Sequence, residues 1–417
     1  MNTLSPDLWL SRFEEHLREQ GFRRKTIQRA LAATRRFLHF LQDRAVSIEN
    51  VGAAVLDDFF AAQLQQYQQR HGRSPQGVNH WRHLFNRGVT RFLRFALGSW
   101  PPRPIPNNDR EEFHQQICDE YAKWLADARG LAPATIAARR SQSWQFIAWL
   151  GERAGRDNLQ NLSVKDVDAW LMTKLIHSRR STRAEQTQDL RCFLRYLYAQ
   201  GMIARDLAAT VTSPSLYAFE SLPSAIKSDD ILTVLRHTKQ DQTPRGLRDF
   251  AILTLLAIYG LRAGEIVGLR LDDIDWRHGD IFIRHSKTGA ETHLPLMPEV
   301  ADAIVNYLRK GRPQTQSRQI FIRAKAPHQP FQDGSSLYTL VARRLNRAGI
   351  KVQGKQGPHA FRHARAISLL RADVSLKTIG DILGHKTTTS TTDYIRLEME
   401  DLRSIGLEVP SIEEVLQ

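Results

Sequence analysis

The spacing of apolar residues predicts two successive groups of amphipathic helices in the first half of the chain. In both groups, apolar residues recur every three or four positions, as one face of a helix requires. The pattern predicts helices over 5–20, 26–43, 53–68 and 77–97, and then over 111–129, 135–153, 164–177 and 183–200. Thr26 and Thr135 are expected to cap the second helix of their groups, because a threonine oxygen can accept from a free helical amide.

The second half of the chain contains one stretch with the period of a strand. Two runs, 280–284 and 292–296, flank Lys287-Thr288-Gly289 and predict a β-hairpin. Around this hairpin the helical period predicts helices over 228–238, 248–259, 298–310, 335–348, 360–371 and 375–383. The predicted fold class is therefore mainly α with one small antiparallel β-sheet.

Two stretches interrupt the helical period and mark expected linkers. Residues 100–108 hold four prolines, which favour an extended chain. Residues 205–228 contain two more X-Pro pairs. These interruptions predict domains over 1–99, 110–205 and 226–417.

The first two predicted domains are similar to each other in sequence. At an offset of 109 positions, Gly21 aligns with Gly130 and Thr26 aligns with Thr135. Near their ends, one block contains the run LRF and the other contains LRY. We interpret the first block as a diverged duplicate of the second.

The charge of the chain indicates a polyanionic partner. Lys and Arg outnumber Asp and Glu by 59 to 44, giving a net charge of +15 and a pI of about 10.1. Residues 1–110 hold 17 basic and 9 acidic side chains, a balance of +8. Nucleic acid is the commonest partner of so basic a protein, and double-stranded DNA is the partner we expect.

The cysteines and the apolar runs indicate a compartment. Cys118 and Cys192 lie far apart in apolar helical patterns, which favours buried free thiols in a reducing environment. No apolar run approaches the length of a membrane span, and the N-terminus has no signal-peptide pattern. We expect a cytoplasmic protein, associated with the nucleoid in a bacterium, and no membrane contact.

Six residues in the last third of the chain form a set suited to phosphoryl transfer. The set is Arg262, Lys287, His359, Arg362, His385 and Tyr394. Guanidinium groups match the non-bridging oxygens of a pentavalent phosphate, and a tyrosine hydroxyl can attack phosphorus and conserve the bond energy in a covalent link. No carboxylate cluster accompanies the set, so no metal and no cofactor are expected.

His359 and His363 stand four positions apart, a spacing that also suits two metal ligands on one face of a helix. Arg362 lies between them and would repel a cation. The pattern His-x-x-Arg at the start of a helix, after Gly357-Pro358, is better suited to binding a phosphate.

With these residues in place, the segment from about 228 to 397 resembles the catalytic domain of the tyrosine recombinase/integrase family, which includes phage integrases, Cre and the Xer recombinases. Residues 110–205 resemble the helical, SAM-like core-binding domain of that family, and residues 1–99 resemble an extra copy of it. One departure stands after Arg362, where the family usually continues with a Thr-Phe-Ala-like run and this chain has Ala364-Arg365-Ala366.

The resemblance implies a reaction. Tyr394 would attack the scissile phosphate, form a 3′-phosphotyrosyl link and release a 5′-hydroxyl, with Lys287 as the general acid for the leaving oxygen. The freed hydroxyl of a partner duplex would then reverse the step on the exchanged strand, with neither ATP nor a metal.

The resemblance also implies roles for the remaining members of the set. Arg262 and Arg362 would bind the non-bridging oxygens of the phosphate. His359 and His385 would hydrogen-bond these oxygens or manage the proton of the tyrosine. Glu265, one helical turn beyond Arg262, would orient its guanidinium.

The expected function is therefore that of a site-specific DNA recombinase or integrase, for integration and excision or for a mobile element. It would act on double-stranded DNA with specific recombination sites, as a homotetramer on synapsed DNA. A type IB topoisomerase, which reseals the same strand, and a catalytically inactive, architectural DNA-binding protein are the alternatives. Beyond the tyrosine, Ser411 and Glu414 form a capping-box pattern that predicts a short C-terminal helix.

Overall fold

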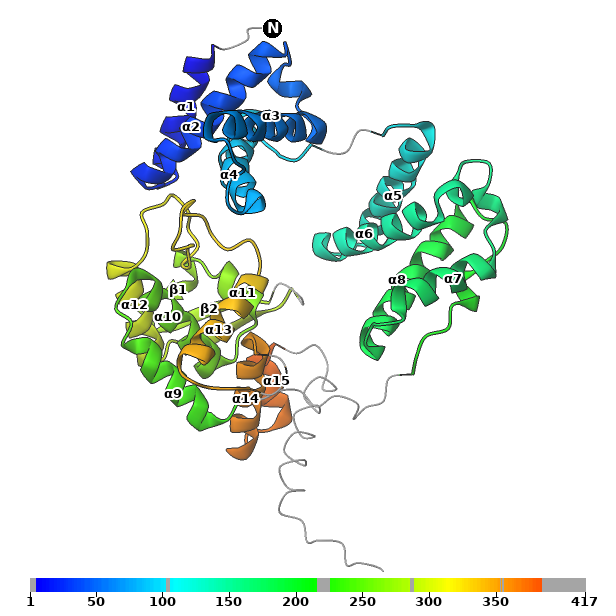
Figure 1. Cartoon of the computed structure of the whole chain (residues 1–417). Coiled ribbons are helices and arrows are strands. Elements are labelled where there is room, and N and C mark those ends of the chain that lie inside the picture. Colours follow the sequence, from blue (N-terminus) through cyan, green and yellow to red (C-terminus); the bar gives the residue numbers. More distant parts are fainter. Residues whose placement is uncertain are drawn as a thin grey trace, which may run out of the picture. The chain divides into compact units, whose positions relative to one another are not determined.

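The computed structural model describes residues 5–102, 106–215, 226–285, 289–352, 354 and 356–384, apart from the side chain of Leu84. The chain divides into two compact units, one of Pro102–Ser221 and one of Met1–Pro101 with Leu222–Gln417 (Figure 1). The larger unit holds separate apolar cores for its two segments. The three expected domains remain a prediction. Within the described ranges, no helix combines the length and the apolar character needed to cross a membrane.

The segment before the first linker folds as helices that share one apolar core. The helices are α1 (Pro6–Glu19), α2 (Arg24–Asp43), α3 (Ala53–His71) and α4 (Val78–Leu97). The α2 helix packs against α1 and α4. Phe13, Phe37, Phe59 and Phe92 are all inaccessible to solvent at the centre. Burying four aromatic rings explains how so basic a segment can hold a core.

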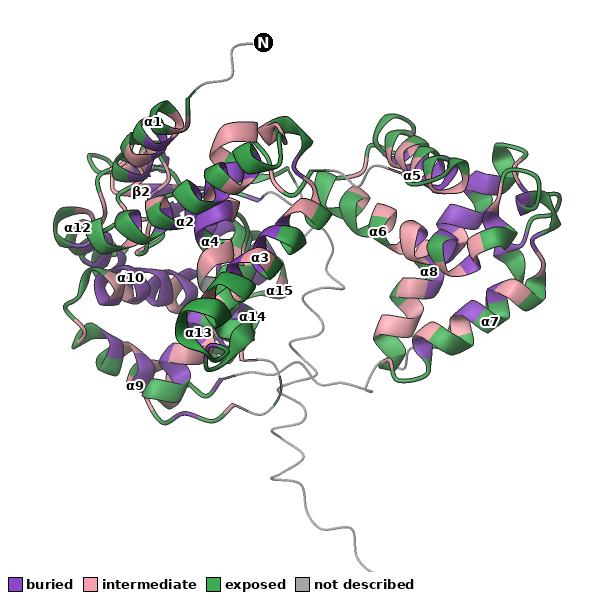
Figure 2. Ribbon diagram, turned by 45° about the horizontal axis from the view of Figure 1, so that its top comes forward, coloured by how far each residue is buried: buried purple, intermediate pink, exposed green. Residues whose placement is uncertain are grey.

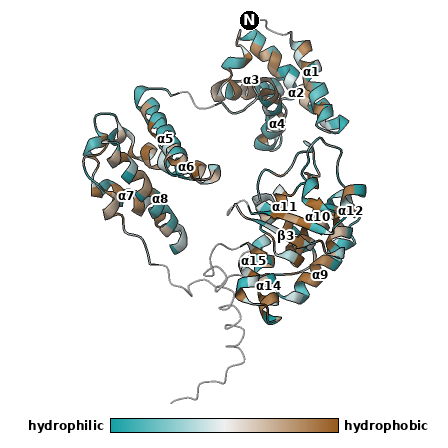
Figure 3. Ribbon diagram, turned by 180° about the vertical axis from the view of Figure 1, so that it is seen from behind, coloured by the Kyte–Doolittle hydropathy of each residue, from teal (hydrophilic) through white to brown (hydrophobic). Residues whose placement is uncertain are grey.

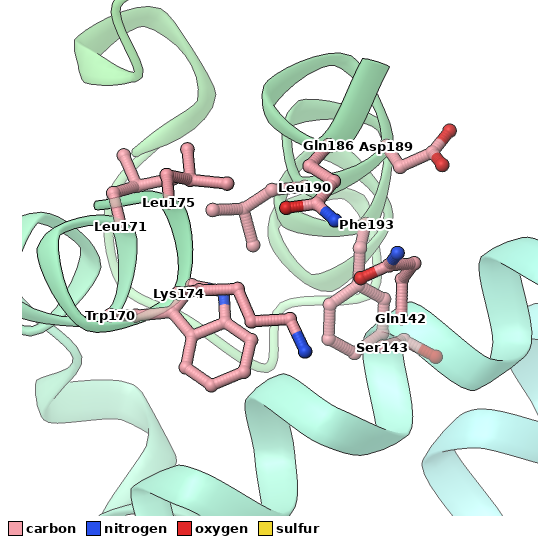
Figure 4. Close-up of a pocket in the computed structure, with 10 residues that line it drawn as sticks. All are labelled: Gln142, Ser143, Trp170, Leu171, Lys174, Leu175, Gln186, Asp189, Leu190 and Phe193. Atoms are coloured by element: carbon pink, nitrogen blue, oxygen red, sulfur yellow. The ribbon is translucent and has the colours of Figure 1, made fainter. Parts of the chain in front are cut away.

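The unit Pro102–Ser221 repeats this helical pattern. Its helices are α5 (Asp109–Asp127), α6 (Pro133–Leu150), α7 (Val164–Leu175) and α8 (Arg180–Ala199). Cys118 and Cys192 are free and buried in it, as expected. Side chains of α6, α7 and α8 line a pocket of about 10 Å³, Lys174 and Phe193 among them (Figure 4). A space of this size holds about one water molecule.

The expected threonine caps are wrong. Arg23 precedes α2 as its N-cap and Ala132 precedes α6, and neither side chain makes a capping hydrogen bond. Thr26 and Thr135 instead occupy the third helical position, where their amides donate to the carbonyls of the two cap residues at 2.8 and 2.9 Å. In α6 the reason is Pro133, whose fixed φ suits the first position of a helix. The two helices nevertheless begin in the same way at the same offset.

The last part of the chain begins with helices and a small sheet. The helices are α9 (Ser228–Lys239), α10 (Pro244–Tyr259) and α11 (Ala263–Gly268). The antiparallel sheet has the order β1 (Ile274–Asp275), β2 (Asp280–Arg284) and β3 (Glu291–Pro295). Ile281 pairs with Leu294 and Arg284 with Glu291. The alternation along β2 buries Ile281 and Ile283 on one face.

The remaining helices follow the sheet in the sequence. They are α12 (Pro298–Lys310), α13 (Ser335–Arg347), α14 (Pro358–Arg371) and α15 (Leu376–Leu383). The α10 helix contacts α9, α12 and α14, and it is coloured almost wholly as buried in Figure 2. It is also apolar along most of its length, whereas α9 shows both hydrophilic and hydrophobic residues in Figure 3. A helix that is apolar all round belongs at the centre of a core.

The predicted fold class, mainly α with a small antiparallel sheet, is confirmed. Several element boundaries differ from the prediction, by up to four residues. The α10 helix begins four residues before the expected 248, because Thr243 accepts a capping bond from the amide of Gly246 and Pro244 opens the helix. The short α11 helix and the two-residue β1 strand were not predicted, since segments of two to six residues carry too little periodicity. The SAM-like character of the two N-terminal helical blocks remains a prediction.

Candidate active site

Arg262 lies at the turn between α10 and α11. Gly260 ends α10 with a left-handed φ of +64°, and Arg262 is the N-cap of α11. Its amide donates to Oε2 of Glu265 at 2.7 Å, and its Nη1 donates to Oε1 of the same carboxylate at 2.8 Å. One buried carboxylate therefore caps the helix and orients the guanidinium that precedes it.

Glu265 lies out of reach of solvent, with 4% of the residue exposed. Burial raises the pKa of this carboxyl, but hydrogen bonds from His285 and from the amide and side chain of Arg262 outweigh it, and the pKa is lowered overall. A carboxylate that accepts several hydrogen bonds stays ionised. Glu265 thus holds a negative charge behind Arg262 across the ordinary pH range.

Arg362 lies on the first turns of α14, at 3% exposure. Its Nη1 donates to the carbonyl of Gly260 at 3.0 Å, and its Nη2 donates to the carbonyl of Leu383. Both acceptors stand at the C-terminal ends of helices, where carbonyls lack intrahelical partners. Arg362 therefore joins α14 to the ends of α10 and α15.

The two arginines meet at the end of α15. Nη2 of Arg262 donates to the carbonyl of Gly384 at 3.0 Å, next to the carbonyl that Arg362 contacts. Gly384 caps α15 with a left-handed φ of +64°, as expected. Helix C-termini carry partial negative charge, which favours cations there. The chain passes directly from this point into His385.

His359 occupies the first turn of α14 and is exposed to solvent. Its ring centroid lies 6.3 Å from that of His363, one turn further along the helix. The position beside the free amides of a helix N-terminus suits an anion. In the described parts of the chain, no group of three or more His, Cys, Asp or Glu side chains is arranged to hold a metal ion.

The structure brings part of the predicted site together. Arg262, Glu265 and Arg362 converge on one point, and His359 lies on the same helix as Arg362. Lys287, His385 and Tyr394 lie outside the described residues, as does the expected C-terminal helix. The hairpin that was predicted around Lys287 is present, since β2 and β3 pair from Asp280 to Pro295.

Sequence analysis missed His285, which contacts Glu265 from the hairpin. Its Nδ1 lies 2.7 Å from Oε1 of Glu265, and only 1% of the residue is exposed. The alternation of β2 could have found it. Ile281 and Ile283 face the core, so the next residue on that face is His285, a polar side chain at an apolar position.

Arg365, the departure noted after Arg362, is half-buried on α14. Burial lowers the pKa of its guanidinium, and its Nε has no hydrogen-bond partner among the described residues. It helps to line a groove of about 770 Å³ whose walls come from α9, α10, α12 and α14. The extra charge therefore belongs to the wall of this groove.

Comparison with known proteins places this site in a family. The sequence model of the phage integrase family matches residues 225–401. A putative integrase/recombinase of Sinorhizobium fredii is 53% identical over 192 residues, which cover 46% of this chain and 98% of the relative. A second putative integrase/recombinase of that organism is 38% identical over 297 residues, covering 71% of each protein.

Solved structures show the same fold. A lambda integrase tetramer bound to a Holliday junction matches with a TM-score of 0.52 and 18% identity, covering 77% of this chain and 87% of the integrase. At this level of identity the likeness concerns the fold, whereas the S. fredii relatives establish the kinship in sequence. The chain therefore belongs to the phage integrase family of tyrosine recombinases.

Proposed function

We propose that the chain is a site-specific DNA recombinase that cuts and rejoins DNA through a covalent link between Tyr394 and a 3′-phosphate. The observation that carries the proposal is the convergence of Arg262 and Arg362 on adjacent carbonyls at the end of α15, immediately before His385. Family membership supplies the reaction class, and this convergence indicates where the phosphate would bind.

The arginines supply most of the electrostatic stabilisation in the proposal. Phosphoryl transfer accumulates negative charge on the non-bridging oxygens, and planar guanidinium groups donate to two oxygens at once. Glu265 orients the guanidinium of Arg262 through one bond of 2.8 Å and holds the backbone amide of the same residue through another of 2.7 Å. A preorganised donor costs no rearrangement as the charge develops, which makes such groups effective in catalysis.

The covalent step needs no reactant other than the DNA and the protein. The phenolic oxygen of Tyr394 forms a bond to phosphorus while the bond to the 5′-oxygen breaks. His385 or His359 takes the phenolic proton, and Lys287 gives one to the leaving oxygen. The reverse step, with the 5′-hydroxyl of a partner strand as nucleophile, restores the phosphodiester and the tyrosine. One phosphoester replaces another in each step, so no energy source is required.

A trapping experiment distinguishes this function from the alternatives. The protein is incubated with nicked suicide substrates that carry sequences from the ends of its host element. A recombinase yields a covalent 3′ adduct at one defined position and joins strands between two sites. Relaxation of supercoiled plasmid without any sequence requirement would favour the topoisomerase, and binding without an adduct would favour the architectural protein. The family relationship favours the recombinase.

The partner in the proposal is double-stranded DNA bearing recombination sites, held by a tetramer. The basic balance of the chain suits a DNA partner, and a lambda integrase of the same fold forms a tetramer on a Holliday junction. A role in integration, excision or movement of a mobile element follows the same proposal, as does a cytoplasmic location at the nucleoid.

The groove beside Arg365 suits the C-terminal segment of a neighbouring subunit. Its lining includes Leu232 and Met297, which are 55% and 39% exposed. The predicted tail helix combines apolar residues with Glu413 and Glu414, which match the apolar lining of the groove and the half-buried Arg365. In the proposal, this contact joins the subunits of the tetramer.

Truncation after Arg403 tests the assembly. The shortened protein is expected to bind a single site normally, because the arginines and the basic N-terminal segment remain. It should fail to pair two sites, as measured by gel mobility of the synaptic complex. The variant Leu232→Asp should show the same defect from the side of the groove. Full recombination by both proteins would contradict the assembly proposal and leave the cleavage chemistry untouched.

A further inference from the structure

His285 connects three elements around the arginine site. It follows β2, and its buried ring is bonded at both nitrogens. Nδ1 lies 2.7 Å from Oε1 of Glu265 on α11, and Nε2 lies 2.8 Å from Oγ1 of Thr292 on β3. A Cβ atom on Gly384 would lie 2.4–2.6 Å from the ring, so the imidazole also packs against the end of α15.

The chemistry of Glu265 fixes the direction of the first of these bonds. Glu265 is an ionised carboxylate and can only accept, so Nδ1 of His285 donates to it. In the neutral imidazole, Nε2 then accepts from the hydroxyl of Thr292. The oxygen that receives Nδ1–H is the one that receives Nη1 of Arg262. The hairpin and the guanidinium are therefore held by the same atom.

The backbone of His285 also closes the turn that follows β2. Its amide donates to the carbonyl of Ala290 at 2.8 Å, and its carbonyl accepts from the amide of Gly289 at 2.8 Å. Gly289 and Ala290 are thus both bonded to the backbone of His285. These backbone bonds join the two strands of the hairpin, whereas the side chain joins the hairpin to Glu265 on α11. Removal of the imidazole would leave the backbone bonds in place and remove the side-chain link to α11.

We propose that His285 is a positioning residue, which holds the turn bearing Lys287 in register with Arg262 through their shared partner Glu265. The inference rests on the proposed function, in which Lys287 protonates the leaving 5′-oxygen. His285 does not touch DNA in this proposal. Its contribution is to keep the proton donor and the arginines in one fixed arrangement, because a small displacement of a general acid costs much of its effect.

The test compares two substrates in single-turnover cleavage. One nicked duplex has an ordinary phosphodiester, and the other has sulfur in place of the bridging 5′-oxygen. A thiolate leaves without a proton, so the second substrate needs no general acid. The variants are His285→Ala, which loses both bonds, His285→Asn, whose amide can still donate to Glu265, and Thr292→Val, which loses one bond. His278→Asn is the control, since His278 is an exposed histidine bonded to Asp275 in the same sheet.

On the phosphodiester, His285→Ala is expected to lose about 10²-fold in cleavage rate, the usual contribution of general acid–base catalysis. On the sulfur substrate it should cleave within a few-fold of the unaltered protein, as should Lys287→Ala. His285→Asn should lose less than His285→Ala, and His278→Asn should match the unaltered protein on both substrates. Thermal unfolding identifies any variant that fails to fold, and Thr292→Val then provides the comparison.

The outcomes distinguish the proposed role of Lys287 as the general acid from the proposed role of His285 in positioning it. If sulfur rescues Lys287→Ala but not the His285 and Thr292 variants, Lys287 is the acid and His285 does not position it, which overturns the inference alone. If sulfur fails to rescue Lys287→Ala, the proposed role of Lys287 is wrong, and the inference falls with it. If sulfur rescues all three variants, Lys287→Ala, His285→Ala and Thr292→Val, the proposed roles of Lys287 and of His285 are both supported.

Discussion

Arg262 and Arg362 donate hydrogen bonds to the carbonyls of two adjacent residues, Gly384 and Leu383. Arg262 precedes α11 and Arg362 lies in α14, and the two are 100 positions apart in the sequence. Both side chains therefore hold the end of α15. Gly384 is followed directly by His385. These contacts therefore hold the two arginines next to the start of the segment that contains the predicted His385 and Tyr394.

Replacement of either arginine by lysine should abolish most of the cleavage. A lysine keeps the charge but cannot donate to two acceptors in one plane. We expect Arg262→Lys and Arg362→Lys to lose about 10²-fold or more in the rate of covalent adduct formation, the range for loss of one oxyanion-stabilising group. Arg318→Lys, in an exposed pair with Asp272, is the control. Near-normal cleavage by both site variants would refute the role of the arginines.

A carboxylate 13 positions before Arg262 lies in the core of the last part of the chain. Asp249 is wholly buried and accepts from Arg248, Arg343 and Arg344 at 2.7–2.9 Å. The change Asp249→Asn would leave the buried guanidinium of Arg248 without a counter-charge, so the free energy of unfolding should fall by about 3–5 kcal/mol. Urea denaturation measures it.

The exposed pair of Asp272 with Arg318 provides the matched comparison for Asp249. Asp272→Asn should lower the free energy of unfolding much less than Asp249→Asn does, because surface ion pairs contribute little. If the two substitutions lowered the free energy of unfolding equally, burial of Asp249 would not be the reason for its predicted effect.

The lowered pKa of Asp241 predicts that the folded protein loses stability in acid. Burial raises the pKa of this carboxyl, but hydrogen bonds from Thr243 and Arg344 outweigh it and lower the pKa to about 2. The folded form thus binds fewer protons than the unfolded form. The contribution is complete above the ordinary aspartate pKa of about 4 and is lost as the pH falls toward 2.

Unfolding measured between pH 5 and 2 tests this statement. The stability advantage of the unaltered protein over Asp241→Asn should shrink as the pH falls through that window. Asp157→Asn, at an exposed position, is the control for removal of one charge. A constant difference between the unaltered protein and Asp241→Asn across the window would contradict the assignment.

Most of the fold could be predicted from sequence, because long helices and the hairpin repeat their apolar residues over several turns or alternations. The grouping of Arg262, Glu265 and Arg362 was also predictable in kind, from residue types and from the turn at Gly260. The hydrogen-bond acceptors of the two arginines at the end of α15 could not be predicted, because Gly384 and Leu383 contribute backbone carbonyls, which do not depend on residue type. The contact of His285 with Glu265 depends on the register of the strands.

The basic segment 1–99 is expected to extend the contact with DNA. Its sequence and helices resemble those of the block that follows, and Lys and Arg exceed Asp and Glu by 8 over residues 1–110. Deletion of residues 1–105 should shorten the footprint and reduce the slope of log affinity against log salt, because fewer phosphates are neutralised. Nuclease protection and salt titrations measure the two effects. An unchanged footprint and slope would indicate a role in protein contacts.

The central claim is that Tyr394 forms the covalent bond with DNA. The direct measurement is the yield of covalent protein–DNA adduct on a nicked suicide substrate, for the unaltered protein and for Tyr394→Phe. Loss of one hydroxyl should abolish the adduct and leave DNA binding nearly unchanged, because Arg262 and Arg362 remain in place. An adduct of normal yield with Tyr394→Phe would contradict the account.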